Sequence, residues 1–138
     1  MCLFKDTKIH KHNRPLVAKE DIVCYKILTY WSRYNEYYTP IQDEKIPNKC
    51  IKEKVPFKAP ILNIFKFIRK HILGGSPSVE EDFIHTFIDV NKPFSERRDR
   101  VIFKCIIPKD TLYYVGTDND YASRQIIFLE PVNIADLR

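Results

Sequence analysis

The chain has 138 residues, enough for one domain with one core, and its hydrophobic share of 44% is that of an ordinary globular protein. It contains only three Gly and neither a GxGxxG nor a P-loop pattern, which excludes dinucleotide or triphosphate binding by those routes. The net charge of +5 is uneven: residues 1–70 carry 15 Lys and Arg against 7 Asp and Glu, and residues 71–138 carry 8 against 11. A basic half attracts anionic partners, although interspersed lysines of this kind are also typical of a solvated surface.

The first third of the chain predicts an arm, two strands and a loop. Residues 1–20 are polar and basic and contain Pro15, so we expect a flexible arm. Residues 22–29 (IVCYKILT) form a continuous run typical of a strand. The aromatic segment 31–38 predicts a turn into a second short strand. Two prolines and many charges predict a loop over 42–58.

One segment, 60–73, has the pattern of a helix. Apolar residues recur there at i, i+4, i+7 and i+11 and would form one stripe along the helix: Ile61, Phe65, Ile68 and Ile72. Pro60 suits a first helical position, and Gly74 and Gly75 suit the end. We therefore expect the main helix of the protein here.

The second half of the chain predicts mostly sheet. Short apolar runs separated by turn residues indicate strands at 83–88, 101–107, 112–115 and 125–129. A polar turn is expected over 116–120. The sequence therefore predicts a single α+β domain over residues 1–138, with a mostly antiparallel sheet of five to seven short strands and one main helix.

The four cysteines, Cys2, Cys24, Cys50 and Cys105, form no CxxC pair, so neither a zinc site nor a thioredoxin-type site is predicted. Cys24 and Cys105 lie in apolar runs and are expected to be free thiols in the core. We expect no metal and no cofactor.

No signal peptide is recognisable, because charged residues interrupt the first apolar positions. The longest apolar segment, 61–73, contains three cations and is too short to span a bilayer. We therefore expect a cytoplasmic protein without a membrane partner.

His85 is the first candidate for a functional side chain. In a strand it shares a face with Phe83 and Phe87. An imidazole on an aromatic face can serve a ligand pocket as a hydrogen-bond donor or general base. The alternative is a buried imidazole bonded to a backbone group.

A second group of candidates surrounds the turn at 116–120: Tyr113, Tyr114, Tyr121, Ser123 and Arg124. Tyrosines can stack on a base while Arg and Ser bind phosphate, so these residues with His85 predict a ligand site for a nucleotide. The alternative is structural, since adjacent tyrosines in a strand point to opposite faces.

Six segments of the chain form a recognisable pattern: MCL at 1–3, DIVCYK at 21–26, FIHTF at 83–87, CIIPKDTLYYVG at 105–116, YAS at 121–123 and IIF at 126–128. Together they resemble a family of small uncharacterised proteins from gut anaerobes and their bacteriophages. The resemblance does not extend to residues 42–80, which look like a variable insert. Asp110 occupies a position where family members usually have Gly. The resemblance implies a phage or mobile-element setting, and the family has no assigned activity.

The strand and turn ending in Ile107-Pro108-Lys109-Asp110-Thr111 are also similar to part of the ADP-ribosyltransferases. In that alignment the family's catalytic glutamate falls at Lys104, and a cation there cannot stabilise the positive charge that develops on the nicotinamide ribose. The similarity therefore implies that this chain lacks the transferase reaction.

We expect a non-catalytic, phage-type accessory protein that binds a phosphorylated small molecule, such as a nucleotide immune signal, and so counters host defence. One alternative is an ADP-ribosyltransferase-like or hydrolytic enzyme that uses His85. Another is a protein–protein inhibitor of a host factor. A homo-oligomer is compatible with the sequence, whereas the absence of recognition-helix, zinc-finger and RNP patterns argues against nucleic acid as a partner.

Overall fold

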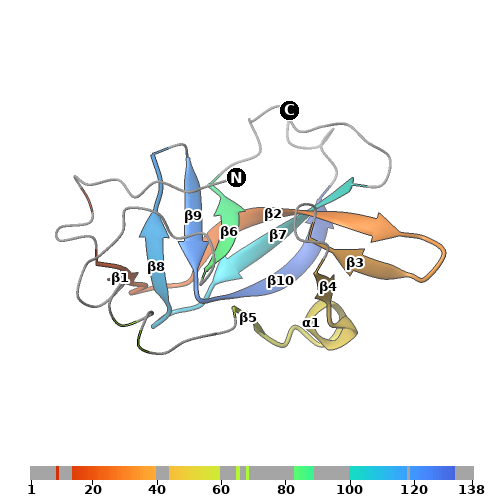
Figure 1. Cartoon of the computed structure of the whole chain (residues 1–138), viewed down its shortest axis with the longest axis horizontal. Coiled ribbons are helices and arrows are strands. Elements are labelled where there is room, and N and C mark those ends of the chain that lie inside the picture. Colours follow the sequence, from red (N-terminus) through yellow and green to blue (C-terminus); the bar gives the residue numbers. More distant parts are fainter. Residues whose placement is uncertain are drawn as a thin grey trace.

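The computed structural model describes residues 9, 14–39, 44–59, 65, 68, 83–88, 100–117 and 119–132. Within these residues the chain forms one sheet with antiparallel pairing throughout (Figure 1). Its strands are β1 (Leu16–Val17), β2 (Ile22–Trp31), β3 (Glu36–Tyr38), β4 (Lys45–Ile46), β5 (Phe57–Lys58), β6 (Ile84–Phe87), β7 (Arg100–Ile107), β8 (Leu112–Val115), β9 (Asp120–Ser123) and β10 (Gln125–Val132).

The predicted α+β class is wrong, because the fold is mainly β and the described residues include no helix of seven or more residues. The one α-helix whose bounds the structure describes, α1 (Asn48–Lys52), lies inside the segment that was expected to be a loop. The predicted helix over 60–73 lies outside the described residues except for Phe65 and Ile68. The strands also exceed the expected five to seven, since two-residue strands such as β4 are too short to show an alternating pattern.

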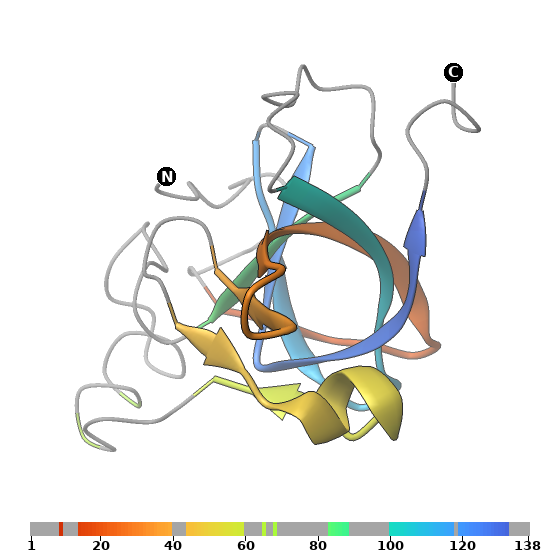
Figure 2. The ribbon, with the colours of Figure 1, turned by 90° about the vertical axis from the view of Figure 1, so that its right-hand side faces the viewer.

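The strand order is β1-β8-β9-β6-β2-β7-β10-β5, with β3 paired to β2 and β4 paired to β3. The long strands β2, β7 and β10 bend strongly, so the sheet curls around its inner face (Figure 2). The longest pairing joins β2 to β7 and runs from Ile22↔Ile107 to Thr29↔Arg100. β-branched and aromatic residues dominate β2, which suits a strand in the middle of a sheet.

The main core fills the inner face of the curled sheet. Successive residues of a strand point to opposite faces, so alternate residues of β2, β7 and β10 meet there. Phe103, 1% exposed, contacts Tyr37 and Phe128 edge to face, with ring centroids 5.1 and 5.6 Å apart. The buried members of this core are Ala18, Cys24, Leu28, Ile46, Cys50, Phe57, Ala59, Ile84, Phe103, Cys105, Ile107, Ile126 and Phe128.

A smaller cluster packs on the opposite, outer face. Phe83, Tyr114 and Ala122 are buried there, with Leu112 against them. The Phe83 and Tyr114 rings meet edge to face at 5.1 Å. The β6–β9–β8 part of the sheet is therefore covered on both faces.

The expected arm over 1–20 is partly built into the sheet. Leu16 and Val17 pair with Tyr113 and Leu112 of β8. Ala18 N donates to Thr111 O at 2.9 Å and Ala18 O accepts from Asp110 N at 2.7 Å. Residues 1–8 and 10–13 lie outside the described residues.

Candidate functional site

The structure divides the predicted ligand residues between the two faces of the sheet. Residues directly opposite each other on neighbouring strands share a face. Tyr113 lies opposite Ser123 and so shares its face. Tyr121 precedes Ser123 by two residues in β9 and lies on the same face. This is the inner face, because Tyr113 and Tyr121 pack against the main core. Tyr114 and His85 both lie opposite Ala122 and so share the outer face. One ligand can therefore contact only one of these two groups.

Arg124 takes part in a structural contact between two strand ends. Its Nη2 donates to Ala59 O at 2.6 Å, and Ala59 N donates to Arg124 O at 2.9 Å. The guanidinium lies over the Phe83 ring, with its carbon 5.7 Å from the ring centroid. These contacts tie β5 to the junction of β9 and β10.

The turn after β8 meets the end of the His85 strand. Ile88 N, just past β6, donates to Asn119 O at 3.0 Å. Asn119 has φ 52°, a left-handed conformation that Asn tolerates better than most residues. The inner face beside this turn carries two fully buried hydroxyls, Thr86 Oγ1 and Ser123 Oγ, that have no hydrogen-bond partner among the described residues.

Lys26 is a charged residue on the inner face that sequence reasoning did not single out. β2 and β6 share one ladder pair, Tyr25↔Phe87, and then diverge. The Lys26 Nζ donates to His85 O at 2.8 Å and so satisfies a carbonyl close to that point of divergence. Burial lowers the pKa of Lys26 from 10.5 to about 8, although Cys105, Cys24 and Glu44 act in the opposite direction.

The two thiols beside Lys26 are buried and unreactive in character. Cys24 and Cys105 lie directly opposite each other on β2 and β7. Burial raises the pKa of Cys24 to about 11 and raises that of Cys105 further. Thr86 Oγ1 lies near the Cys24 thiol and lowers its pKa slightly, without the geometry of an ordinary hydrogen bond. Neutral thiols of this kind are poor nucleophiles.

An exposed aromatic surface lies on the β2–β3 hairpin, which extends beyond the neighbouring strands at the right of Figure 1. Trp31 is 49% exposed and Tyr34 55% exposed, and their rings stack with centroids 6.4 Å apart. The Tyr38 ring lies 5.6 Å from Trp31. We call Trp31, Tyr34 and Tyr38 the aromatic platform.

The platform lies on the outer face of the sheet. Tyr30 and Tyr37, which alternate with its residues, point inward, and Tyr37 reaches Phe103 in the core. Trp31 therefore points away from the core, as does Tyr38. Arg33 lies over the Tyr34 ring, with its guanidinium carbon 5.6 Å from the centroid.

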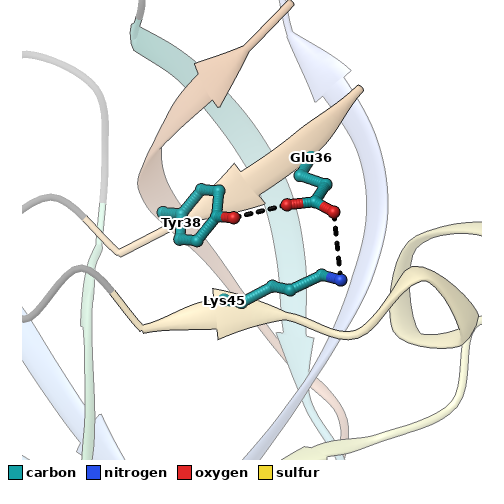
Figure 3. A network of polar contacts seen from close by, with 3 residues as sticks. All are labelled: Glu36, Tyr38 and Lys45. Carbon is teal, nitrogen blue, oxygen red and sulfur yellow. Dashed lines mark hydrogen bonds and ion pairs between the residues drawn. The ribbon is translucent and has the colours of Figure 1, made fainter. Parts of the chain in front are cut away.

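Polar contacts hold the edge of the platform in place (Figure 3). The Tyr38 hydroxyl donates to Glu36 Oε2, and the Lys45 Nζ lies 3.1 Å from Glu36 Oε1. These two donors lower the pKa of Glu36, so the carboxylate stays ionised at neutral pH. The contacts fix the orientation of the Tyr38 ring.

The sequence carries one sign of this surface. Three aromatic residues at 31, 34 and 38 stand among polar residues, around a turn. Aromatic side chains are as common in sheet cores as on binding surfaces, and only the pairing Trp31↔Glu36 shows that these point outward.

The part of the chain that the structure describes contains no group of three or more His, Cys, Asp and Glu that could hold a metal ion. None of its helices is long and apolar enough to cross a membrane. Comparison with protein-family models found no match, and neither did comparisons with curated proteins and with solved structures.

Proposed function

We propose that this chain is a non-catalytic binding protein for a phosphorylated ligand with an aromatic base, in the simplest case a nucleotide signal. The observation that carries the proposal is the aromatic platform, where Trp31 and Tyr34 are stacked on each other and about half exposed. Stacking of a base on such a ring contributes roughly 1–3 kcal/mol.

Two cations beside the platform suit the phosphate of such a ligand. Arg33 lies over Tyr34, and the Lys45 ammonium lies beside Glu36. Arg can bind phosphate through two parallel hydrogen bonds, whereas Lys acts as a point charge. This arrangement keeps the expected ligand class and moves the proposed contacts from Tyr113, Tyr114 and Arg124 to the hairpin.

The proposed biological setting rests on the resemblance to phage proteins. A phage protein that binds a host nucleotide signal in the cytoplasm would remove the signal without chemical change and so counter host defence. No nucleophile or acid–base pair is needed for that role. The buried, neutral thiols of Cys24 and Cys105 are consistent with a protein that only binds.

Trp31 is the only tryptophan of the chain, so its fluorescence reports on the platform alone. Titration with cyclic and linear nucleotides should quench this fluorescence and give a saturating curve. Arg33→Ala should weaken binding and flatten its dependence on salt, because a charge-assisted contact is lost. Arg124→Ala is the matched control and should leave binding unchanged, since its guanidinium is bound to Ala59 O.

If binding were lost in Arg124→Ala and kept in Arg33→Ala, the ligand would bind at the residues first predicted around the β8–β9 turn. The absence of any quenching or calorimetric signal at millimolar nucleotide would refute the proposed ligand class.

The same hairpin favours a second candidate, a protein–protein inhibitor of a host factor. Trp, Tyr and Arg are the residues most enriched among those that dominate binding energy at protein interfaces, and Trp31, Tyr34 and Arg33 occur together at a projecting turn. In that case Tyr34→Ala would abolish capture of one specific host protein, while nucleotides would leave Trp31 fluorescence unchanged.

A further inference from the structure

We propose that the ligand of the aromatic platform is a single-stranded nucleic acid, which binds along the outer face of the β2–β3 hairpin. This inference rests on the proposed function, because it names the polymer whose bases would use the same surface.

The platform offers more aromatic surface than one base can cover. Trp31 and Tyr38 belong to adjacent strands, and Tyr34 belongs to the turn between those strands. The successive rings of Tyr34, Trp31 and Tyr38 have centroids 6.4 and 5.6 Å apart. A base stacks on one ring face, so three neighbouring rings suit successive bases of one strand.

Cations lie on more than one side of the platform. Arg33 is at the turn, over Tyr34. Arg100 lies at the start of β7 directly opposite Thr29, which is two residues before Trp31 and on the same outer face. Two residues of strand correspond to roughly 7 Å, so Arg100 and Arg33 lie on either side of Trp31.

The local charge is positive although an acid is present. Arg33, Arg100 and Lys45 contribute three positive charges, and Glu36 contributes one negative charge. Lys45 already lies against Glu36 and offsets its repulsion of phosphate. The two arginines remain as the cations expected to follow a sugar–phosphate backbone.

The sequence argued against nucleic acid because it contains none of the motifs that read a base sequence. A stacking surface needs no such motif, since every base has an aromatic face and the backbone supplies the charge. The expected binding therefore has little sequence preference, a strong dependence on salt and a dependence on strand length.

The test compares dTMP with oligothymidylates of two to ten nucleotides, followed by Trp31 fluorescence and by anisotropy of a labelled strand. We expect affinity to rise at least tenfold from dTMP to the longer strands and then to level off. Tyr34→Ala should lose about five- to hundredfold in affinity for the decamer, which corresponds to one stacked base. Arg100→Ala should reduce the slope of log K against log salt by about 1.

Lys109→Ala is the control for Arg100, because Lys109 is exposed and follows the opposite end of β7. It should leave both affinity and salt slope unchanged. If dTMP quenches Trp31 and the decamer binds no more tightly, this inference is wrong and the proposed function stands. If no nucleotide or strand changes Trp31 fluorescence, both are wrong. Tight binding of the decamer that is insensitive to Tyr34→Ala would also overturn the inference, because the strand would then bind elsewhere.

Discussion

Replacing Lys26 by Met should remove a pH-dependent cost from the folded state. In the unfolded chain the Lys26 ammonium has its ordinary pKa of 10.5, and in the folded protein burial lowers that pKa to about 8. Between these values the unfolded state binds more protons than the folded state, so the free energy of unfolding rises with pH. Below pH 8 the full cost is present, and above pH 10.5 it is gone.

The size of the effect follows from the two pKa values. A difference of this size corresponds to about 3 kcal/mol over the whole window, of which about 1 kcal/mol is regained between pH 8 and pH 9. Cys24 and Cys105 act in the opposite direction, because burial raises their pKa above the ordinary value of 9.0 and stability is lost as pH rises past it. The contribution of Lys26 is therefore visible only against a variant that keeps both thiols.

The measurement is urea unfolding of the wild type and of Lys26→Met at pH 7, 8 and 9. The difference in unfolding free energy, wild type minus variant, should increase by about 1 kcal/mol from pH 8 to pH 9. Loss of the donor to His85 O adds a constant cost to the variant of about 1–3 kcal/mol, which does not change with pH. A difference that stays flat across this range would show that the Lys26 ammonium is solvated, and the reasoning would fail.

Three further outcomes are expected. Phe103→Ala should lower the free energy of unfolding, measured by chemical denaturation, by about 3–5 kcal/mol, because the ring is buried. Phe65→Ala is the control and should lower it by less than about 1 kcal/mol, because that residue is 81% exposed. Equal losses for the two variants would show that Phe103 is not in the core. Cys24 and Cys105 should react with a thiol reagent only at the rate of unfolding, and rapid labelling of either of these two residues in the native protein at pH 8 would contradict their burial. The protein should release no nicotinamide from NAD, because Lys104 stands where a transferase would have its glutamate; release that is abolished by His85→Ala would support the enzyme alternative instead.

The long strands could be predicted from the sequence because their patterns extend over many residues. The runs at 22–29 and 101–107 correspond to β2 and β7, and Cys24 and Cys105, which were expected in the core, are buried. β10 continues three residues past its expected end and includes Pro131, at a place where a register irregularity follows Phe128. Proline is tolerated at such irregular positions of a sheet.

The class of the fold could not be predicted, since it depends on pairings that leave no local pattern. Leu16–Val17, Lys45–Ile46 and Phe57–Lys58 become strands only because a longer strand lies beside each of them. β9 was not predicted either, because Asp120 and Ser123 are typical turn residues and are buried here by tertiary contacts.

The candidate site shows the same limit at the level of side chains. Proximity in sequence suggested that Tyr113, Tyr114 and Arg124 act together, but the pleat of β8 separates the two tyrosines. The inward orientation of Lys26 could have been predicted, because every second residue of a strand points to the same face and Lys26 lies midway between the buried Cys24 and Leu28. The hydrogen bond from Lys26 to His85 O could not have been predicted, because it depends on where β2 and β6 diverge.

Among the residues that the structure describes, β2 and β6 share a single rung, which lies between two groups of more extensively paired strands. On one side, β2, β7 and β10 are joined by long ladders, and on the other, β6, β9 and β8 form a smaller sheet of their own. Across the line between them lie Tyr25↔Phe87 and the Lys26 ammonium, and the connection from β9 to β10 consists of one residue, Arg124. Sub-global opening should therefore begin along this line, with amide hydrogens of β6, β8 and β9 exchanging with solvent while those of β2 and β7 remain protected.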